Sequence, residues 1–87
     1  MTNMRNTSLD AYESIKDDLS KKQLTVLQAL KTLKTATNRQ ISKYLDWEIN
    51  RVTGRTNELY NKGFIIGDDR IKDTETNRTV TLWKYDN

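Results

Sequence analysis

Residues 37–66 limit the possible folds of this chain more than any other stretch. Thr37 and Gln40 form a capping-box pair, which predicts that a helix begins at residue 38. The apolar side chains that follow at helical spacing are Ile41, Tyr44 and Leu45. A short polar break at 46–48 then separates this helix from a second one. The pattern therefore predicts two short helices joined by a tight turn.

The second helix is predicted to run from residue 49 to Gly63. Its inward stripe, spaced three, four and three residues apart, is Ile49, Val52, Thr56 and Leu59. Gly63 stands where a helix end needs a left-handed residue, and an extended run begins at Phe64. Two angled helices followed by a strand are typical of the helix-turn-helix plan. In DNA-binding versions of this plan, the second helix enters the major groove.

The outward face of this second helix is rich in asparagine. Asn50, Asn57 and Asn61 share that face with Gly54, and arginines flank it. Gly54 costs about 0.5–1 kcal/mol relative to alanine in a helix interior, and asparagine is a weak helix former. Asn and Arg read adenine and guanine edges, while glycine permits a close approach of another backbone. We therefore interpret the face as a groove-reading surface; the alternative is a solvated face in a chain rich in Asn and Thr.

The composition excludes several classes of function. Eighty-seven residues, 34% hydrophobic and 31% charged, support one domain with a small core. The absence of cysteine removes disulfides and zinc-finger ligation, and the absence of histidine removes the usual general base. We therefore expect no enzyme, no metal and no cofactor. No apolar run is long enough to cross a membrane or to serve as a signal peptide, so we expect a cytoplasmic protein.

Positive charge is concentrated in the middle of the chain. Residues 20–36 carry four lysines and no acid, and residues 37–63 carry five basic and three acidic side chains. The first 19 residues and the last 24 are both slightly acidic, although the whole chain has a net charge of +3. A basic middle is the footprint expected of phosphate binding, although cytosolic helices also carry lysine for solubility.

The N-terminal part divides into three segments. Residues 1–7 are polar and are expected to be disordered. Residues 8–19 are expected to form a short helical extension with Leu9, Tyr12, Ile15 and Leu19 near one face. A firmer helix should begin after Ser20, which pairs with Gln23 in a second capping box. Its apolar side chains, which we assign to the core, are Leu24, Val26, Leu27, Leu30 and Leu33.

The C-terminal part predicts a β-hairpin. A strand begins at Phe64, a polar loop spans 68–77, and the alternating run 78–85 suits a second strand. Trp83 and Trp47 are interpreted as packing residues. Three cations of the hairpin could reach phosphates or a minor groove: Arg70, Lys72 and Arg78. Four acids in the loop oppose such contacts.

In this order, the elements resemble those of winged helix-turn-helix domains, particularly the small regulators encoded by phages and prophages. The resemblance covers residues 8–85. The segments that carry it are LSKKQLTVLQAL, TNRQISKYLDWEINRVTGRTNELYNKGFI and VTLWKY. Its specific part is the pattern INRVT-x-R-x-x-EL-x-x-x-G-x-I, from Ile49 to Ile65. It implies an α+β fold with a three-helix core, an extra N-terminal helix and a two-stranded β wing, all in one domain over 8–87.

The resemblance also implies roles for particular side chains. The recognition helix would read DNA through Asn50, Arg51, Thr53, Gly54, Arg55 and Asn57. Helix starts commonly cross the phosphate backbone in such domains, which assigns that role to Lys21, Lys22, Arg39 and Lys43. The wing role falls to Arg70, Lys72 and Arg78.

The expected function is sequence-specific binding of double-stranded DNA by a small transcriptional regulator in a bacterial or phage-infected cell. Residues 8–19 could also join two copies into a homodimer. Two alternatives stay open: a winged-helix adaptor that binds protein, and a replication or architectural accessory that binds DNA. A narrower similarity, of EINRV at 48–52 and LWK at 82–84 to Z-DNA-binding domains, is disfavoured. The chain has no proline, and alignment on Leu59 and Gly63 places Asn57 where those domains carry a tyrosine.

Overall fold

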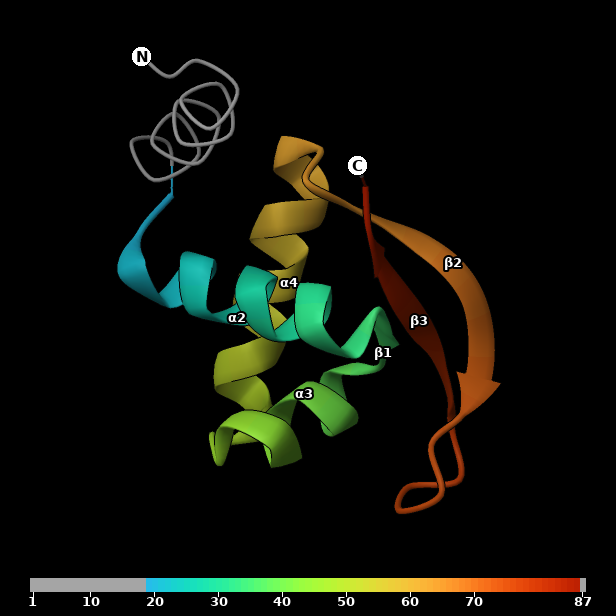
Figure 1. Ribbon diagram of the computed structural model, residues 1–87. Coiled ribbons are helices and arrows are strands. Elements are labelled where there is room, and N and C mark those ends of the chain that lie inside the picture. The colour runs from blue at the N-terminus through green and yellow to red at the C-terminus, as the bar shows by residue number, and fades with distance from the viewer. Residues whose placement is uncertain (1–18, 87) are drawn as a thin grey trace, which may run out of the picture.

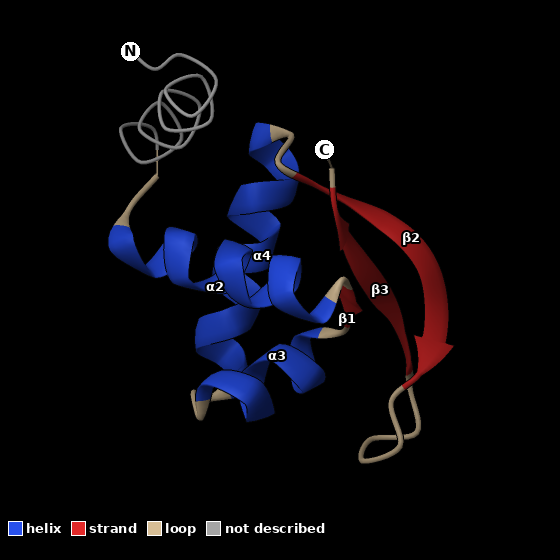
Figure 2. Cartoon of the chain, viewed as in Figure 1, coloured by secondary structure: helices blue, strands red, loops and turns tan. Residues whose placement is uncertain are grey.

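The computed structural model describes residues 19–86, which form three helices and a small antiparallel sheet (Figures 1 and 2). The expected disorder of 1–7 and the expected helix over 8–18 lie outside the described residues. The elements are α2 (Lys21–Leu33), β1 (Thr35–Ala36), α3 (Asn38–Leu45), α4 (Ile49–Lys62), β2 (Ile65–Lys72) and β3 (Thr79–Tyr85). Within this part of the chain, no helix is both long and apolar enough to cross a membrane.

Both predicted capping boxes are present. The Ser20 hydroxyl accepts a hydrogen bond from the Gln23 backbone N–H at 3.1 Å, and the Gln23 side chain accepts one from the Ser20 backbone N–H at 2.9 Å. Thr37 and Gln40 exchange the same two bonds at the start of α3. Each box satisfies two groups that a helix start otherwise leaves unpaired, so the sequence located both starts correctly.

Left-handed residues end α3 and α4. Asp46 follows α3 with φ of 59°, and Gly63 follows α4 with φ of 88°. Between the two helices, the Ser42 hydroxyl donates a 2.6 Å hydrogen bond to the Trp47 carbonyl, which closes the turn. The predicted tight turn and the predicted glycine stop of the second helix are therefore confirmed.

The sheet has three strands in the order β1-β3-β2 rather than the two predicted. Thr35 and Ala36 pair with Lys84 and Trp83, so the short strand after α2 closes one side of the hairpin. The predicted loop over 68–77 is also too long, because β2 continues through Lys72 opposite Thr79. A β-bulge between Gly67 and Asp69 interrupts the pairing of β2 with β3.

The core lies where the three helices meet one face of the sheet. It contains the inward side chains of α2 and α4, together with Ile41, Ala36, Ile65 and Trp83. Two assignments from the sequence were wrong. Tyr44 is 53% exposed, because α3 buries only its other face, and Ile49 is only half-buried at the beginning of α4. The predicted packing role of Trp83 is confirmed, and Trp47 is half-buried against the core.

Asn38 joins three elements through one carbonyl oxygen. Its Oδ1 accepts from the Thr56 hydroxyl of α4 at 2.8 Å and from the Trp83 indole N–H of β3 at 2.9 Å. Its Nδ2 donates to the Thr53 hydroxyl at 3.3 Å. Thr56 is fully buried. Because buried polar groups are costly when unpaired, this acceptor at the first residue of α3 allows a threonine and a tryptophan to be buried together.

Replacing Asn38 should test this network. Asn38→Ala leaves the Trp83 N–H without its acceptor, and the Thr56 hydroxyl keeps only the Thr53 carbonyl, at 3.2 Å. We therefore expect the free energy of unfolding to fall by about 1–3 kcal/mol. Asn38→Asp keeps the acceptor and places a carboxylate at a helix start, where it is favourable, so it should lose less than about 1 kcal/mol. Urea unfolding followed by circular dichroism measures both. Equal losses in the two variants would contradict the role of the carbonyl oxygen.

Candidate nucleic-acid interface

One face of α4 presents polar side chains to solvent. Asn50, Arg51 and Asn57 are exposed, whereas Val52 and Thr56 face the core. The amide side chains of Asn50 and Asn57 make no hydrogen bond to any residue in the range 19–86. Two amides without protein partners on one exposed helix face can donate to and accept from an incoming ligand.

Arg51 is pre-positioned by an aromatic ring. Its guanidinium carbon lies 4.8 Å from the centroid of the Trp47 ring, in the segment that leads into α4. Such cation–π contacts stabilise the charged group over the ring face and leave its N–H groups available for hydrogen bonds. Trp47 therefore both packs against the core and supports an exposed cation next to Asn50.

Arg55 differs from the other predicted readers because it is already paired. Its Nε and Nη2 donate to the two carboxylate oxygens of Glu58 at 2.8 and 2.9 Å. Gln23 of α2 donates to the same carboxylate at 2.7 Å. The bond from Arg55 is the largest cause that lowers the pKa of Glu58, and the same bond raises the pKa of Arg55. This group links α2 to α4, so reading by Arg55 would require its rearrangement.

Thr53 and Gly54 occupy the middle of the predicted reading surface. The Thr53 hydroxyl donates to the Ile49 carbonyl at 3.0 Å and accepts from Asn38, so its polar atom is used within the protein. A side chain at Gly54 would meet no atom within 4 Å. Gly54 therefore leaves open space on α4, next to side chains that can bind bases.

The four cations predicted to contact the DNA phosphate backbone fall into two pairs. Lys21 and Lys22 are exposed at the start of α2, and their ammonium groups pair with no acid among residues 19–86. Arg39 and Lys43 of α3 are paired with acids of the hairpin tip. Arg39 Nε lies 3.3 Å from Asp73 Oδ2 and its Nη1 lies 3.5 Å from Glu75 Oε1, while Lys43 forms an ion pair with Glu75 Oε2.

Asp73 organises the tip between β2 and β3. Its carboxylate accepts from the Glu75 backbone N–H at 3.1 Å and from the Thr76 hydroxyl at 3.2 Å, in addition to Arg39. Its backbone bonds to Arg78 and Asn77 close the loop. The Asp73 side chain is only 7% exposed. Asp73 is one of the four loop acids that were expected only to oppose phosphate contacts, but in the structure it is the centre of the turn.

Both tip carboxyls have lowered pKa values. The Glu75 backbone N–H is the largest cause of the lowered pKa of Asp73, and Arg39 also contributes. Lys43 is the largest cause of the lowered pKa of Glu75. The wing tip and α3 are therefore joined most firmly when both carboxyls are ionised.

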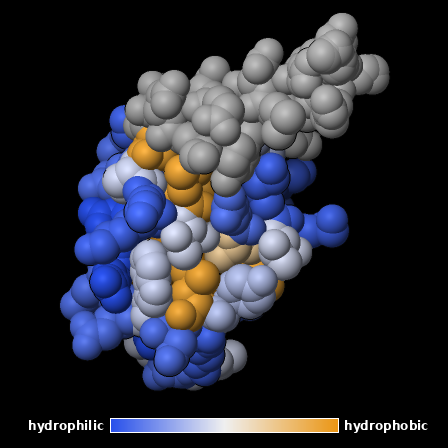
Figure 3. Space-filling view, turned by 60° about the vertical axis from the view of Figure 1, so that its left-hand side comes forward, coloured by the Kyte–Doolittle hydropathy of each residue, from blue (hydrophilic) through white to orange (hydrophobic). Residues whose placement is uncertain are grey.

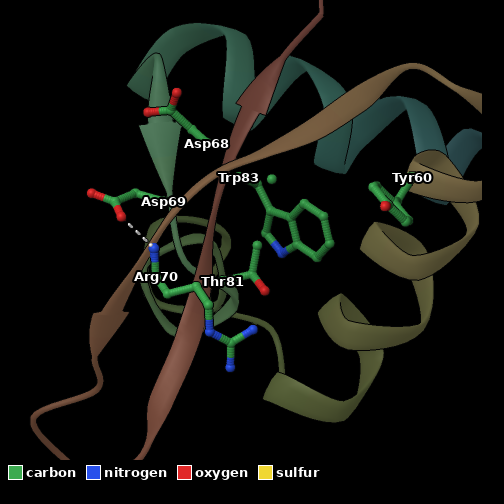
Figure 4. Close-up of a pocket in the computed structure, with 7 residues that line it drawn as sticks. Tyr60, Asp68, Asp69, Arg70, Thr81 and Trp83 are labelled. Atoms are coloured by element: carbon green, nitrogen blue, oxygen red, sulfur yellow. Dashed lines mark hydrogen bonds between the residues drawn. The ribbon is translucent and has the colours of Figure 1, made fainter.

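The predicted wing cations lie on β2 and in the loop that follows it, and all three are exposed: Arg70, Lys72 and Arg78. Figure 4 shows that the Arg70 side chain extends past Thr81, whereas Asp68 and Asp69 point away from the two aromatic rings. The surrounding cleft, about 410 Å³ in volume, lies between α4 and the hairpin, and Tyr60 and Trp83 also line it. Those two ring centroids are 5.4 Å apart.

The structure places some of the predicted site residues close to other elements of the site. Arg70 lines the same cleft as Tyr60 of α4, and Arg39 and Lys43 form ion pairs with the hairpin tip. Sequence reasoning missed Asn38, Tyr60 and Glu75. A polar residue directly after a helix cap was the available signal for Asn38, but the other two depend on contacts between distant segments. In the described part of the chain, no group of three His, Cys, Asp or Glu residues could hold a metal ion.

The lowered pKa values predict how stability depends on pH. A carboxyl with a lowered folded-state pKa stabilises the fold above its unfolded-state value, near about 4, and this contribution is lost as the pH falls through the folded-state value. Wild-type stability in urea should therefore decline between about pH 5 and pH 2. Asp73→Asn should be less stable at pH 7 and should decline less over that range. A decline as steep as in the wild type would contradict the assignment; Asp68→Asn, which removes an unpaired acid, is the control.

Comparison with solved structures confirms the winged helix-turn-helix fold. The chain is similar to a MarR variant from E. coli in complex with operator DNA, with a TM-score of 0.61 and 23% identity over 79% of this chain and 46% of that one. It is also similar to YusO from Bacillus subtilis, with a TM-score of 0.63 and 19% identity over 98% of this chain and 69% of that one.

A third similar structure is the adhesin competence repressor AdcR from Streptococcus pyogenes, with a TM-score of 0.59 and 22% identity over 97% of this chain and 63% of that one. The chain thus spans about half of MarR and about two thirds of the other two proteins. No protein-family model matches the sequence, and no curated protein matches it. At these identities the similarity establishes the fold.

Proposed function

We propose that this protein binds double-stranded DNA sequence-specifically and acts as a small transcriptional regulator of the phage type. In the proposed complex, α4 lies in the major groove and the hairpin wing contacts the backbone or the minor groove. The observation that carries the proposal is the exposed polar face of α4 formed by Asn50, Arg51 and Asn57, whose side chains form no hydrogen bond or ion pair with residues 19–86. A protein of the same fold has been captured on operator DNA.

The chemistry of this face suits base edges. Asparagine can pair through two hydrogen bonds with adenine, and arginine with guanine. Gly54 leaves space beside them, and Thr53 and Arg55 complete the proposed surface after rearrangement of their internal bonds. Lys21 and Lys22 would hold phosphates, as would Arg39 and Lys43 if their acidic partners release them. The proposed wing contacts are Arg70, Lys72 and Arg78.

The proposal describes a binding protein rather than an enzyme, which works without a metal or cofactor in the cytoplasm of a bacterial or phage-infected cell. A gel shift of the full chain against random and self-genomic duplexes, at two salt concentrations, tests it directly. Affinity should fall with salt in proportion to the phosphates that the protein neutralises, and a subset of duplexes should be retained at the higher salt. Equal retention of all duplexes would contradict sequence-specific reading.

The reading role of α4 can be tested on two side chains. Asn57→Ala and Arg51→Ala should each cost about 1–3 kcal/mol on the preferred duplex and relax the base preference, because each removes contacts to base edges. Fluorescence anisotropy on the preferred duplex and on single-base variants measures both effects. Thr32→Ala, at an exposed position of α2, is the matched control. If both α4 variants keep full affinity and selectivity while folded, α4 is not the reading element.

We further propose that two copies act together as a homodimer. A single domain of this size reads few base pairs, and helix-turn-helix dimers bind two half-sites about 34–36 Å apart. Residues 8–19 are the proposed contact; only Leu19 of them belongs to the described residues, and it is buried at 6% exposure. On the face shown in Figure 3, apolar side chains reach the surface between hydrophilic ones, which would suit such a contact.

Sedimentation of the full chain and of a chain that starts at Leu19 tests the dimer. We expect the full chain to sediment as a dimer at high micromolar concentration, and the shorter chain to sediment as a monomer with its helical circular dichroism retained. A monomeric full chain at that concentration would contradict a dimer in free solution. A shorter chain that remains dimeric would place the contact elsewhere.

A second candidate function, a protein-binding adaptor, is favoured by one observation. The sheet face turned away from Trp83 carries Ile66, which is 40% exposed, and the half-buried Ile71, Val80 and Leu82. Exposed apolar side chains in one place are typical of protein contacts. A folded wild type that retains no duplex even at low salt would favour this function over DNA binding.

A further inference from the structure

A notch lies between α3 and the hairpin tip. It is about 260 Å³ in volume, and its walls include Arg39 and Lys43 on one side and residues 71–75 on the other. We call it the α3–wing notch. Glu75 also lines it: one carboxylate oxygen lies 3.5 Å from Arg39 Nη1 and the other forms an ion pair with Lys43. The notch thus presents two cations that can hold an anion with two acceptor oxygens, and within the protein the Glu75 carboxylate pairs with both.

The two acids at the notch are held in different ways. Asp73 is nearly buried, and its carboxylate accepts from the Glu75 backbone, from Thr76 and from Arg39. The Glu75 side chain is 43% exposed and, within residues 19–86, its carboxylate forms ion pairs only with the two cations. Asp73 therefore maintains the turn, whereas the Glu75 carboxylate can leave the two cations without loss of another hydrogen bond or ion pair within that range.

We propose that the α3–wing notch is a binding site for a DNA phosphate, and that Glu75 competes with this phosphate from within the protein. The inference rests on the DNA-binding function proposed above. A phosphodiester presents acceptor oxygens as a carboxylate does, and Arg and Lys bind both. An exposed ion pair between a glutamate and a lysine is worth little, so a phosphate can displace Glu75.

This competition acts equally on every DNA sequence. Each duplex offers the same phosphates, so displacement of Glu75 weakens binding to all duplexes by the same factor. Base contacts from α4 are made only on the preferred sequence. The ratio of affinities for preferred and random DNA is therefore unchanged. Glu75 lowers the affinity for every duplex without touching a base.

Simple charge repulsion is the rival explanation, and the chain provides a control for it. Asp68 carries the same charge on the same hairpin, is exposed, and pairs with no cation among the described residues. Asp68→Asn and Glu75→Gln both remove one negative charge from the wing. Only Glu75→Gln removes the carboxylate that pairs with Arg39 and Lys43.

The experiment is a double-mutant cycle on random-sequence duplex at low salt, with dissociation constants from fluorescence anisotropy. We expect Glu75→Gln to tighten binding about fivefold, as the loss of one surface ion pair allows, and Asp68→Asn to tighten it less than about twofold. In a Lys43→Gln background, the gain from Glu75→Gln should fall below about twofold, because the notch then keeps only Arg39, which Asp73 also holds. An unchanged urea midpoint for Glu75→Gln would show that the turn persists.

Two results would overturn the inference alone: equal gains from Glu75→Gln and Asp68→Asn, or a gain from Glu75→Gln that is undiminished in the Lys43→Gln background. The first would mean that only the total wing charge matters, and the second that Glu75 acts without the notch. If neither the wild type nor Glu75→Gln retains any duplex, the proposed DNA-binding function itself is overturned and the inference with it.

Discussion

The arrangement of the domain depends on one amide oxygen. Asn38 is the first residue of α3, and its Oδ1 accepts hydrogen bonds from Thr56 on α4 and from Trp83 on β3. These three elements carry the proposed reading face, the wing and the helix between them. A purely apolar contact could slide, because the hydrophobic effect has no direction. Hydrogen bonds at 2.8 and 2.9 Å have a preferred geometry, so they set the angle at which α4 meets the sheet.

The charged groups serve two opposite purposes. Some cations hold the protein together: Arg55 links to α2 through the Glu58 carboxylate, and Arg39 links α3 to the Asp73 turn. Others, such as Lys21 and Lys22, have no acidic partner in the described region. Net charge alone cannot separate these two classes, although only the second is immediately available to phosphate. The available positive potential of the domain is therefore smaller than a count of lysine and arginine suggests.

Local signals in the sequence predicted the helices well. Two capping boxes and Gly63 defined where α2 and α3 begin and where α4 ends, because the hydrogen bonds involved join residues only a few positions apart. The core role of Thr56 also followed from helical spacing. The strands were predicted less well. β1 has only two residues and is stabilised by pairing with Trp83 and Lys84, nearly fifty positions away, and the charged half of β2 lacks an apolar alternation. The pairing of Arg39 with Asp73 depends on the same distant approach.

The bulge in β2 has a consequence for contacts between molecules. β2 lies at the edge of the sheet, so one side of its backbone has no neighbouring strand. Such an edge can recruit a strand from another molecule and begin aggregation. The bulge interrupts the regular ladder beside Asp68, and four of the eight β2 residues are charged. Irregular pairing and charged side chains along an edge both oppose strand addition. The acids that reduce the positive charge of the wing therefore also protect its open edge from intermolecular β-pairing.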